Sequence, residues 1–219
     1  MSQRDTLTKL IERNQETIED APRDYIGASI IGSECMRQIW YEYKGYKGIE
    51  VPTKTRRTWA IGKALESLVI GWLMRAGIKN YDLDNINPLS QINIPYFQGS
   101  IDSLIEISNT TYILEIKTAK DASFKIFVKK GLREWNFQYY CQIQSYMGMS
   151  GIFSAYIVVL NKDNSELSDE LIIFDAPVYQ RLKEKARIVS EYQEPPARIS
   201  NSPIWFQCKL CKFNKVCHK

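Results

Sequence analysis

Two carboxylates and one lysine are spaced so that they could hold a divalent cation together. Asp102 ends the segment Gly99-Ser-Ile-Asp, and Glu115-Ile116-Lys117 follows it. Because side chains alternate along a strand, Glu115 and Lys117 would project from one face and Ile116 from the other. A strand meander would place Asp102 beside Glu115. Two carboxylates that converge in this way repel each other unless a cation such as Mg²⁺ or Mn²⁺ lies between them.

Hydrolysis of a phosphodiester bond needs this set of groups. A divalent cation polarises the phosphoryl oxygen, lowers the pKa of a bound water and neutralises the charge that develops on the phosphate. Lys117 could orient the attacking water or stabilise the transition state. Taken alone, the Glu-x-Lys triplet fits an ordinary exposed strand better than a metal site. The position of Asp102 brings the two interpretations level.

The periodicity of apolar residues predicts the elements that would position these groups. Helices are expected over residues 6–19, 56–75, 135–149 and 178–191, with a shorter helix around Cys35. Strands are expected over residues 89–94, 99–107, 112–117, 153–160 and 167–174. Helices, then a strand meander, then helix, strand, strand and helix indicate a mixed sheet flanked by helices, in the α/β or α+β class.

Gln142-Ile-Gln-Ser-Tyr146 adds a third motif, because one helical turn separates Gln142 from Tyr146 and both face the same way. In order and spacing, this motif and the two carboxylate motifs resemble the PD-(D/E)XK nuclease superfamily in its RecB-like branch. The resemblance implies a restriction-endonuclease-like fold. It also implies a metal held by two carboxylates and a carbonyl, a catalytic lysine, and a glutamine–tyrosine pair that contacts DNA and steadies the active site. These residues are Asp102, Glu115, Ile116 (carbonyl), Lys117, Gln142 and Tyr146.

The chain departs from this family at two positions. The family usually has Gly-x-x-x-His upstream, its histidine being a metal ligand on a helix, whereas this chain has Gly62-Lys-Ala-Leu-Glu66. Glutamate also supplies an oxygen ligand, so Glu66 is expected to fill the role, the alternative being an exposed helix residue. Ile101 stands where the motif name has proline, at a loosely defined position.

Four of the five cysteines form a second constellation. Cys208-x-x-Cys211-x5-Cys217 lies at the C-terminal end of the sequence, and Cys35 lies far upstream. The arrangement resembles the CRISPR-associated RecB-like exonucleases and AddB-type nuclease domains, which implies a four-iron, four-sulfur (4Fe-4S) cluster that closes a long loop as a disulfide would. Zinc held by four cysteines, or by three cysteines and His218, is the alternative.

The resemblance also suggests how the chain is divided. Its 219 residues are enough for one sizeable core. Residues 1–54 would form a helical segment that supplies one cluster cysteine, residues 55–195 the nuclease core, and residues 196–219 a tail that supplies the other three. One compact unit is expected.

Charge and hydropathy restrict the function less than the motifs do. The formal net charge of +4 says less than the clustering of basic residues in two stretches, 54–57 and 120–133. Either stretch fits a solvated face as well as a DNA-binding surface and identifies no function by itself. No apolar run reaches the about 20 residues of a membrane span, and the N-terminus lacks the pattern of a secretory signal. We therefore expect a soluble, cytoplasmic protein, in the host cytoplasm if a phage encodes it. The residues expected to contact DNA are Arg37, Lys54, Arg56, Arg57, Lys120, Gln142 and Tyr146.

These features favour a Mg²⁺- or Mn²⁺-dependent deoxyribonuclease, and the family precedent is an exonuclease on single-stranded DNA or DNA ends. The alternative is a non-catalytic DNA-binding or assembly module that keeps the fold, although such relatives usually lose the lysine or a carboxylate. A zinc-ribbon adaptor would leave residues 102–117 unexplained. CRISPR adaptation, DNA repair and phage recombination, each with its own protein partners, fit equally well.

Overall fold

The computed structural model describes residues 6–13, 24–81, 94, 96–101 and 103–219, and every structural statement below refers to these residues. A mixed sheet has the strand order β2-β4-β5-β6-β7. β5 and β6 are parallel, and the other neighbours are antiparallel. The strands are β2 (Lys79–Tyr81), β4 (Ser103–Ile107), β5 (Thr110–Ala119), β6 (Ser154–Asn161) and β7 (Leu167–Ile173). A separate parallel pair joins β1 (Ile26–Gly27) to β3 (Phe97–Gln98).

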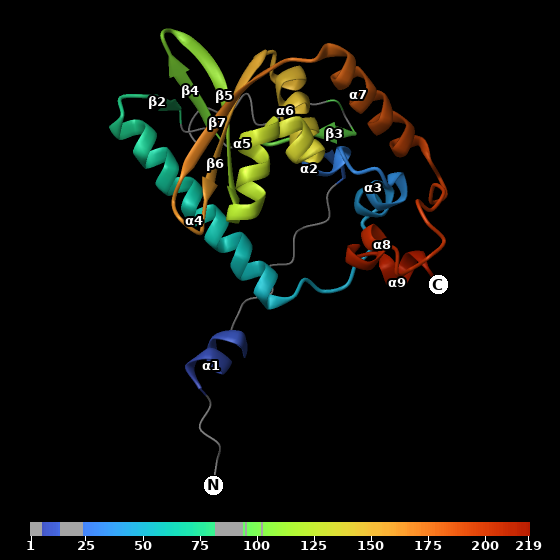
Figure 1. The fold of residues 1–219 in the computed structure, drawn as a ribbon. Coiled ribbons are helices and arrows are strands. Elements are labelled where there is room, and N and C mark those ends of the chain that lie inside the picture. The colour runs from blue at the N-terminus through green and yellow to red at the C-terminus, as the bar shows by residue number, and fades with distance from the viewer. Residues whose placement is uncertain (1–5, 14–23, 82–93, 95, 102) are drawn as a thin grey trace.

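Helices cover both faces of the sheet (Figure 1). The long α4 (Thr53–Arg75) packs on one face, where Val69 joins a cluster of sheet residues. α5 (Asp121–Trp135) and α6 (Phe137–Ser150) pack on the other face and contribute to the main core. The remaining helices are α1 (Leu7–Arg13), α2 (Ala28–Ile31), α3 (Met36–Tyr43), α7 (Ala176–Glu191), α8 (Phe206–Leu210) and α9 (Asn214–Cys217). No described helix is both long and apolar enough to cross a membrane.

The central strand β5 is buried on both faces because its side chains alternate between two apolar clusters. Ile113 belongs to the main core beneath α5 and α6. Leu114 and Ile116 belong to the smaller cluster beneath α4. Near-continuous apolar runs are typical of strands covered on both sides. Glu115 interrupts this run on the face of the main core, and its burial therefore needs a chemical explanation.

The predicted mixed sheet flanked by helices is confirmed, with differences in detail. β2 was not predicted, because three residues with one apolar member give no readable period. Between the predicted strands 99–107 and 112–117, the chain turns at Ser108 and Asn109, which have φ of 51° and 62°. Two successive positive φ values are typical of tight hairpins. The predicted strand 89–94, except Ile94, and the predicted helix beyond Arg13 fall outside the described residues.

Segments from the two ends of the sequence pack together beside the sheet. Figure 1 shows α3 next to α8 and α9. The Phe213 side chain is buried, and its ring centroid lies 5.4 Å from that of Tyr41. The Ile49 backbone N–H donates to the Lys212 carbonyl at 2.8 Å, and Lys212 Nζ contacts Glu42 Oε1 at 2.8 Å. These contacts bring the N-terminal and C-terminal cysteines into one region.

Close packing between α6 and α7 depends on a glycine. A Cβ at Gly148 would lie 2.4 Å from the Tyr179 ring, whereas a Cβ at Gly71 in α4 would meet only Arg75 Nη1 at 3.6 Å. We expect Gly148→Ala to lower the free energy of unfolding by about 1–3 kcal/mol, because the added methyl group would push the Tyr179 ring, and with it α7, away from α6. Gly71→Ala, the matched control, should raise it by roughly 0.5–1 kcal/mol through helix propensity. Urea denaturation measures both, and a stabilised Gly148→Ala would contradict the packing.

Candidate active site

Glu115 and Lys117 lie on the face of β5 that α6 covers, as the strand period predicts. The Glu115 side chain is 1% exposed, and its Oε1 forms an ion pair with Lys117 Nζ. The Lys117 side chain is 18% exposed, so the pair is largely removed from water. Burial of a carboxylate is costly unless an opposite charge or a cation compensates it. A charged pair in the wall of a core is therefore better suited to chemistry than to stability.

Gln142 and Tyr146 lie on α6, opposite this strand. Gln142 Nε2 donates a hydrogen bond to Tyr146 Oη at 2.7 Å, and both side chains are buried. The helix is fixed at its start by Asn136, whose Oδ1 accepts from the Tyr139 N–H at 3.1 Å. It ends at Gly151, whose φ of 73° is the left-handed conformation that glycine favours at a helix end. Both motif residues are thus held in one defined orientation.

Gly99 packs directly against Tyr146. A Cβ on Gly99 would lie 2.6 Å from Tyr146 Cε1 and 2.9 Å from Ala28 Cβ. Only a residue without a side chain allows the segment before β4 to approach this ring so closely. Gly99 and Tyr146, which belong to different sequence motifs, therefore meet in space. This contact explains why the motif has a glycine, and sequence reasoning missed it.

Asp102 lies outside the described residues. Its neighbour in the chain, Ser103, is buried and pairs with Leu114 across β4 and β5. Leu114 directly precedes Glu115 on β5.

The predicted ligand Glu66 lies on α4. It is half-buried, and its neighbours Leu65 and Val69 pack in the cluster that contains Ile116. Within the described parts of the chain, no group of three or more His, Cys, Asp or Glu side chains is arranged to hold a metal ion. The predicted set of Glu66, Asp102 and Glu115 includes a residue outside those parts, so its role in metal binding stays a prediction.

Tyr139 is a residue near this site that sequence reasoning missed. Its ring centroid lies 5.0 Å from Lys117 Nζ. Tyr139 precedes Gln142 by three residues on α6, which places both on the same side of the helix. That spacing is the signal that could have drawn attention to it.

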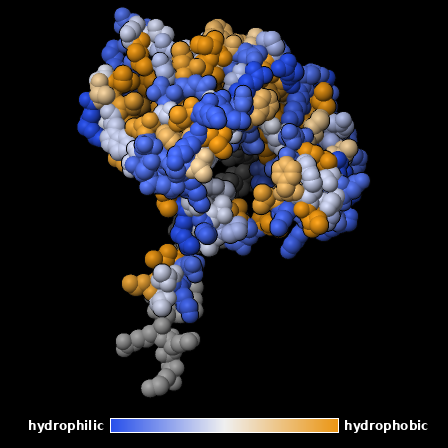
Figure 2. Space-filling model, viewed as in Figure 1, coloured by the Kyte–Doolittle hydropathy of each residue, from blue (hydrophilic) through white to orange (hydrophobic). Residues whose placement is uncertain are grey.

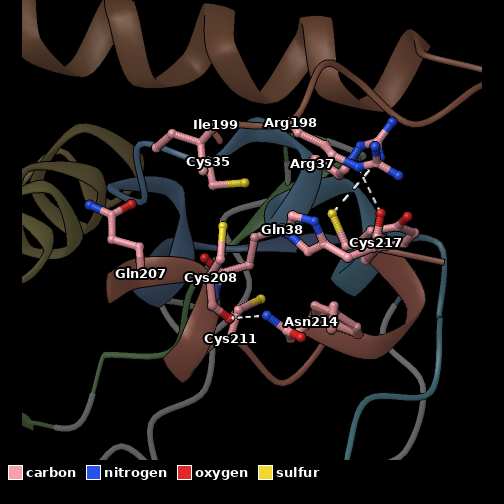
Figure 3. A pocket seen from close by; sticks show the side chains of 13 residues that line it. Cys35, Arg37, Gln38, Arg198, Ile199, Gln207, Cys208, Cys211, Asn214 and Cys217 are labelled. Atoms are coloured by element: carbon pink, nitrogen blue, oxygen red, sulfur yellow. Dashed lines mark hydrogen bonds between the residues drawn. The ribbon is translucent and has the colours of Figure 1, made fainter. Parts of the chain in front are cut away.

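The four predicted cysteines line one pocket. Figure 3 shows the labelled side chains of Cys35, Cys208, Cys211 and Cys217 around a common space, although Cys35 comes from the start of α3 and the others from the C-terminal segment. His218 also lines this pocket, and its Nε2 is buried without a hydrogen-bond partner among the described residues. The lining thus includes four thiols and one imidazole, although among the described residues no three such groups are arranged to hold a metal ion.

The thiols of this pocket influence one another electrostatically. Burial raises the pKa of Cys208, and the neighbouring Cys35 and Cys217 raise it further. Burial likewise raises the pKa of Cys211, a backbone N–H from Phe213 lowers it, and the other three thiols raise it. Several thiolates side by side are unfavourable without a cation to share their charge. The raised pKa values of Cys208 and Cys211 favour the protonated thiol at these two positions.

Arg37 joins this pocket to the C-terminal segment. Arg37 Nε donates to the Pro196 carbonyl at 2.5 Å, and Nη1 donates to Cys217 Sγ at 3.8 Å. Arg198 Nε donates to the Cys217 carbonyl at 2.7 Å. Sequence reasoning gave Arg37 only a role in DNA binding and missed these contacts, because they span up to 180 residues.

The other residues predicted to bind DNA lie at two places. Lys54, Arg56 and Arg57 lie in the first turns of α4, where Arg56 contacts Glu50 at 2.8 Å and Arg57 contacts Glu12 at 3.6 Å. Lys120 follows β5 directly and precedes α5. On the face seen in Figure 2, the surface is hollowed between the part that carries α5 and the part that carries α3 and α8.

No family model and no curated protein sequence matches the chain. Among solved structures, it is similar to the alkaline exonuclease LHK-Exo from Laribacter hongkongensis, with a TM-score of 0.56 and 16% identity over 77% of this chain and 87% of that one. A phage-related exonuclease from Haemophilus somnus 129PT gives a TM-score of 0.56 and 15% identity over 77% and 92%. SSO0001 gives 0.52 and 18% over 96% and 93%. The chain therefore has the restriction-endonuclease-like fold of these exonucleases.

Proposed function

We propose that the chain is a Mg²⁺- or Mn²⁺-dependent DNA exonuclease of the RecB-like branch, acting on single-stranded DNA or DNA ends. The observation that carries the proposal is the buried Glu115–Lys117 pair facing Gln142 and Tyr146 across the sheet–helix interface. A fold shared with exonucleases supports it, and LHK-Exo is also known in complex with dAMP.

The oxygen donors proposed for the metal are Asp102, Glu115, Glu66 and the Ile116 carbonyl. Carboxylate and carbonyl oxygens are the ligands that Mg²⁺ and Mn²⁺ prefer. Asp102 immediately precedes Ser103, the partner of Leu114, and neighbouring Cα atoms are only about 3.8 Å apart. That connectivity suits a carboxylate beside Glu115. When bound, the metal would polarise the phosphoryl oxygen and activate a water.

The remaining side chains have roles that follow from their positions. The Lys117 ammonium would orient the attacking water and balance negative charge on the phosphate. The Gln142 amide and the Tyr146 hydroxyl would hold the DNA strand against the site. Lys54, Arg56, Arg57 and Lys120 would contact phosphates, with the exposed Trp59 available for stacking on a base. Arg37 would reach DNA only at the edge of the cysteine pocket.

The cysteine pocket is proposed to hold a 4Fe-4S cluster. Four thiolates satisfy such a cluster, and here four thiols from distant parts of the sequence surround one space. A cluster at this place would connect residues 1–54 to residues 196–219 and support residues 55–195 between them. All five cysteines are unpaired, which suits an intracellular compartment. In such a compartment, the proposed protein partners are those of recombination, repair or CRISPR adaptation.

The nuclease assignment is tested by removing the ammonium group. We expect Lys117→Ala to lower the rate of cutting by about 100-fold or more, because one positioned charge that stabilises a transition state is typically worth this much. Labelled single-stranded and double-stranded DNA, digested with Mn²⁺ and resolved on gels, measures the rate and the polarity. Lys79→Ala, which breaks a similar Lys–Glu pair with Glu106 on the sheet edge, should leave the rate unchanged. Intact DNA in every condition, with the cysteine pocket loaded, would favour a non-catalytic DNA-binding module.

The cluster is tested by its colour. Protein purified without oxygen should be brown, and Cys35→Ala should lose the broad visible absorbance together with iron and sulfide. The variant should also unfold more easily, by on the order of 4 kcal/mol, because the cross-link over a long loop is gone. Cys141→Ala is the matched control, since Cys141 is buried in α6 and does not line the pocket. Colourless protein that contains zinc would establish the zinc alternative instead.

A further inference from the structure

Tyr139 covers the Lys117 ammonium from the side of α6. The 5.0 Å between Nζ and the ring centroid is within the range of a cation–π attraction. The same ammonium forms the ion pair with Glu115. Lys117 is thus held between a carboxylate on its own strand and an aromatic face on the opposing helix.

The Tyr139 ring is itself held in place by neighbouring aromatic groups. The Trp135 and Tyr139 ring centroids are 5.7 Å apart. Trp135 Nε1 donates to Ser123 Oγ at 2.8 Å, and its ring contacts Phe127, which is buried. With the cap from Asn136 on its backbone N–H, Tyr139 has little freedom to turn away from Lys117.

We propose that Tyr139 is a positioning residue, which keeps the Lys117 ammonium in place when a divalent cation takes up the Glu115 carboxylate. This inference rests on the proposed nuclease function. A bound cation would share the carboxylate charge and repel the ammonium, so the ion pair alone would no longer fix Lys117. The face of an aromatic ring attracts an ammonium without competing for the metal or accepting the lysine's protons.

The adjacent Tyr140 shows that this arrangement is specific to one tyrosine. The Tyr140 ring contacts the Arg133 guanidinium, with 5.2 Å from Cζ to the ring centroid, and its hydroxyl reaches Asp175 Oδ2 at 3.5 Å. Tyr140 therefore serves the contact between α5, α6 and the start of α7, while Tyr139 faces the charged pair on β5.

The test separates the aromatic face from the hydroxyl. In the DNA-cutting assay, Tyr139→Leu should lower kcat roughly 2- to 30-fold, the range that a cation–π attraction supplies, and leave the KM for DNA unchanged. Tyr139→Phe, which keeps the ring face, should restore kcat to near the wild-type value. Phe137→Leu is the matched control, because Phe137 is an exposed aromatic residue two positions away on the same helix.

A second measurement follows the contact itself. In protein labelled with ¹³C at the lysine ε-carbons, the Lys117 signal should be shifted upfield by the ring in the wild type and in Tyr139→Phe, with Mg²⁺ present, and should lose this shift in Tyr139→Leu. Unchanged kcat in Tyr139→Leu with active wild type would overturn the inference and leave the nuclease assignment intact. Equal losses in the Leu and Phe variants would overturn it in favour of a role for the hydroxyl. Wild-type protein that cuts no DNA would overturn both.

Discussion

A buried carboxylate is the constraint on which the rest of the arrangement depends. Glu115 occupies the central strand between two apolar clusters, where a lone negative charge would be strongly destabilising. Its ion pair with Lys117 offsets the free-energy cost of burying the carboxylate, but the buried pair adds little net stability. The chain keeps two opposite charges where an apolar pair would pack better, and the proposed cation and phosphate site would account for them.

Local sequence periods predicted the parts of this site that depend on one element. The alternation of β5 is enough to put Glu115 and Lys117 on one face, and one helical turn is enough to put Gln142 beside Tyr146. Contacts between elements were not predictable in this way. The approach of Gly99 to Tyr146 depends on how the segment before β4 crosses α6, and a glycine in sequence does not say which ring it faces.

Helix α6 connects the charged pair to the cysteine pocket. Its one side faces β5, while its other side supports the segment that leads to Cys35. A Cβ on Gly32 would lie 2.8 Å from Gln138 Cα, and Gln138 Nε2 donates to the Ser29 carbonyl at 2.7 Å. From α7, Lys185 Nζ donates to the carbonyls of the same segment, and burial lowers its pKa. The segment that leads to Cys35 therefore packs against the same helix that faces Lys117.

The cysteines that line the pocket lie far apart in the sequence, and this has a consequence for biosynthesis. Cys35 leaves the ribosome before any strand of the main sheet exists, whereas its three counterparts follow α7. The four sulfurs can meet only after the whole sheet has been translated and has begun to pack. Contacts between residues so far apart in the sequence form slowly. A cluster of the kind proposed for this pocket would therefore assemble late, on a core that is already complete.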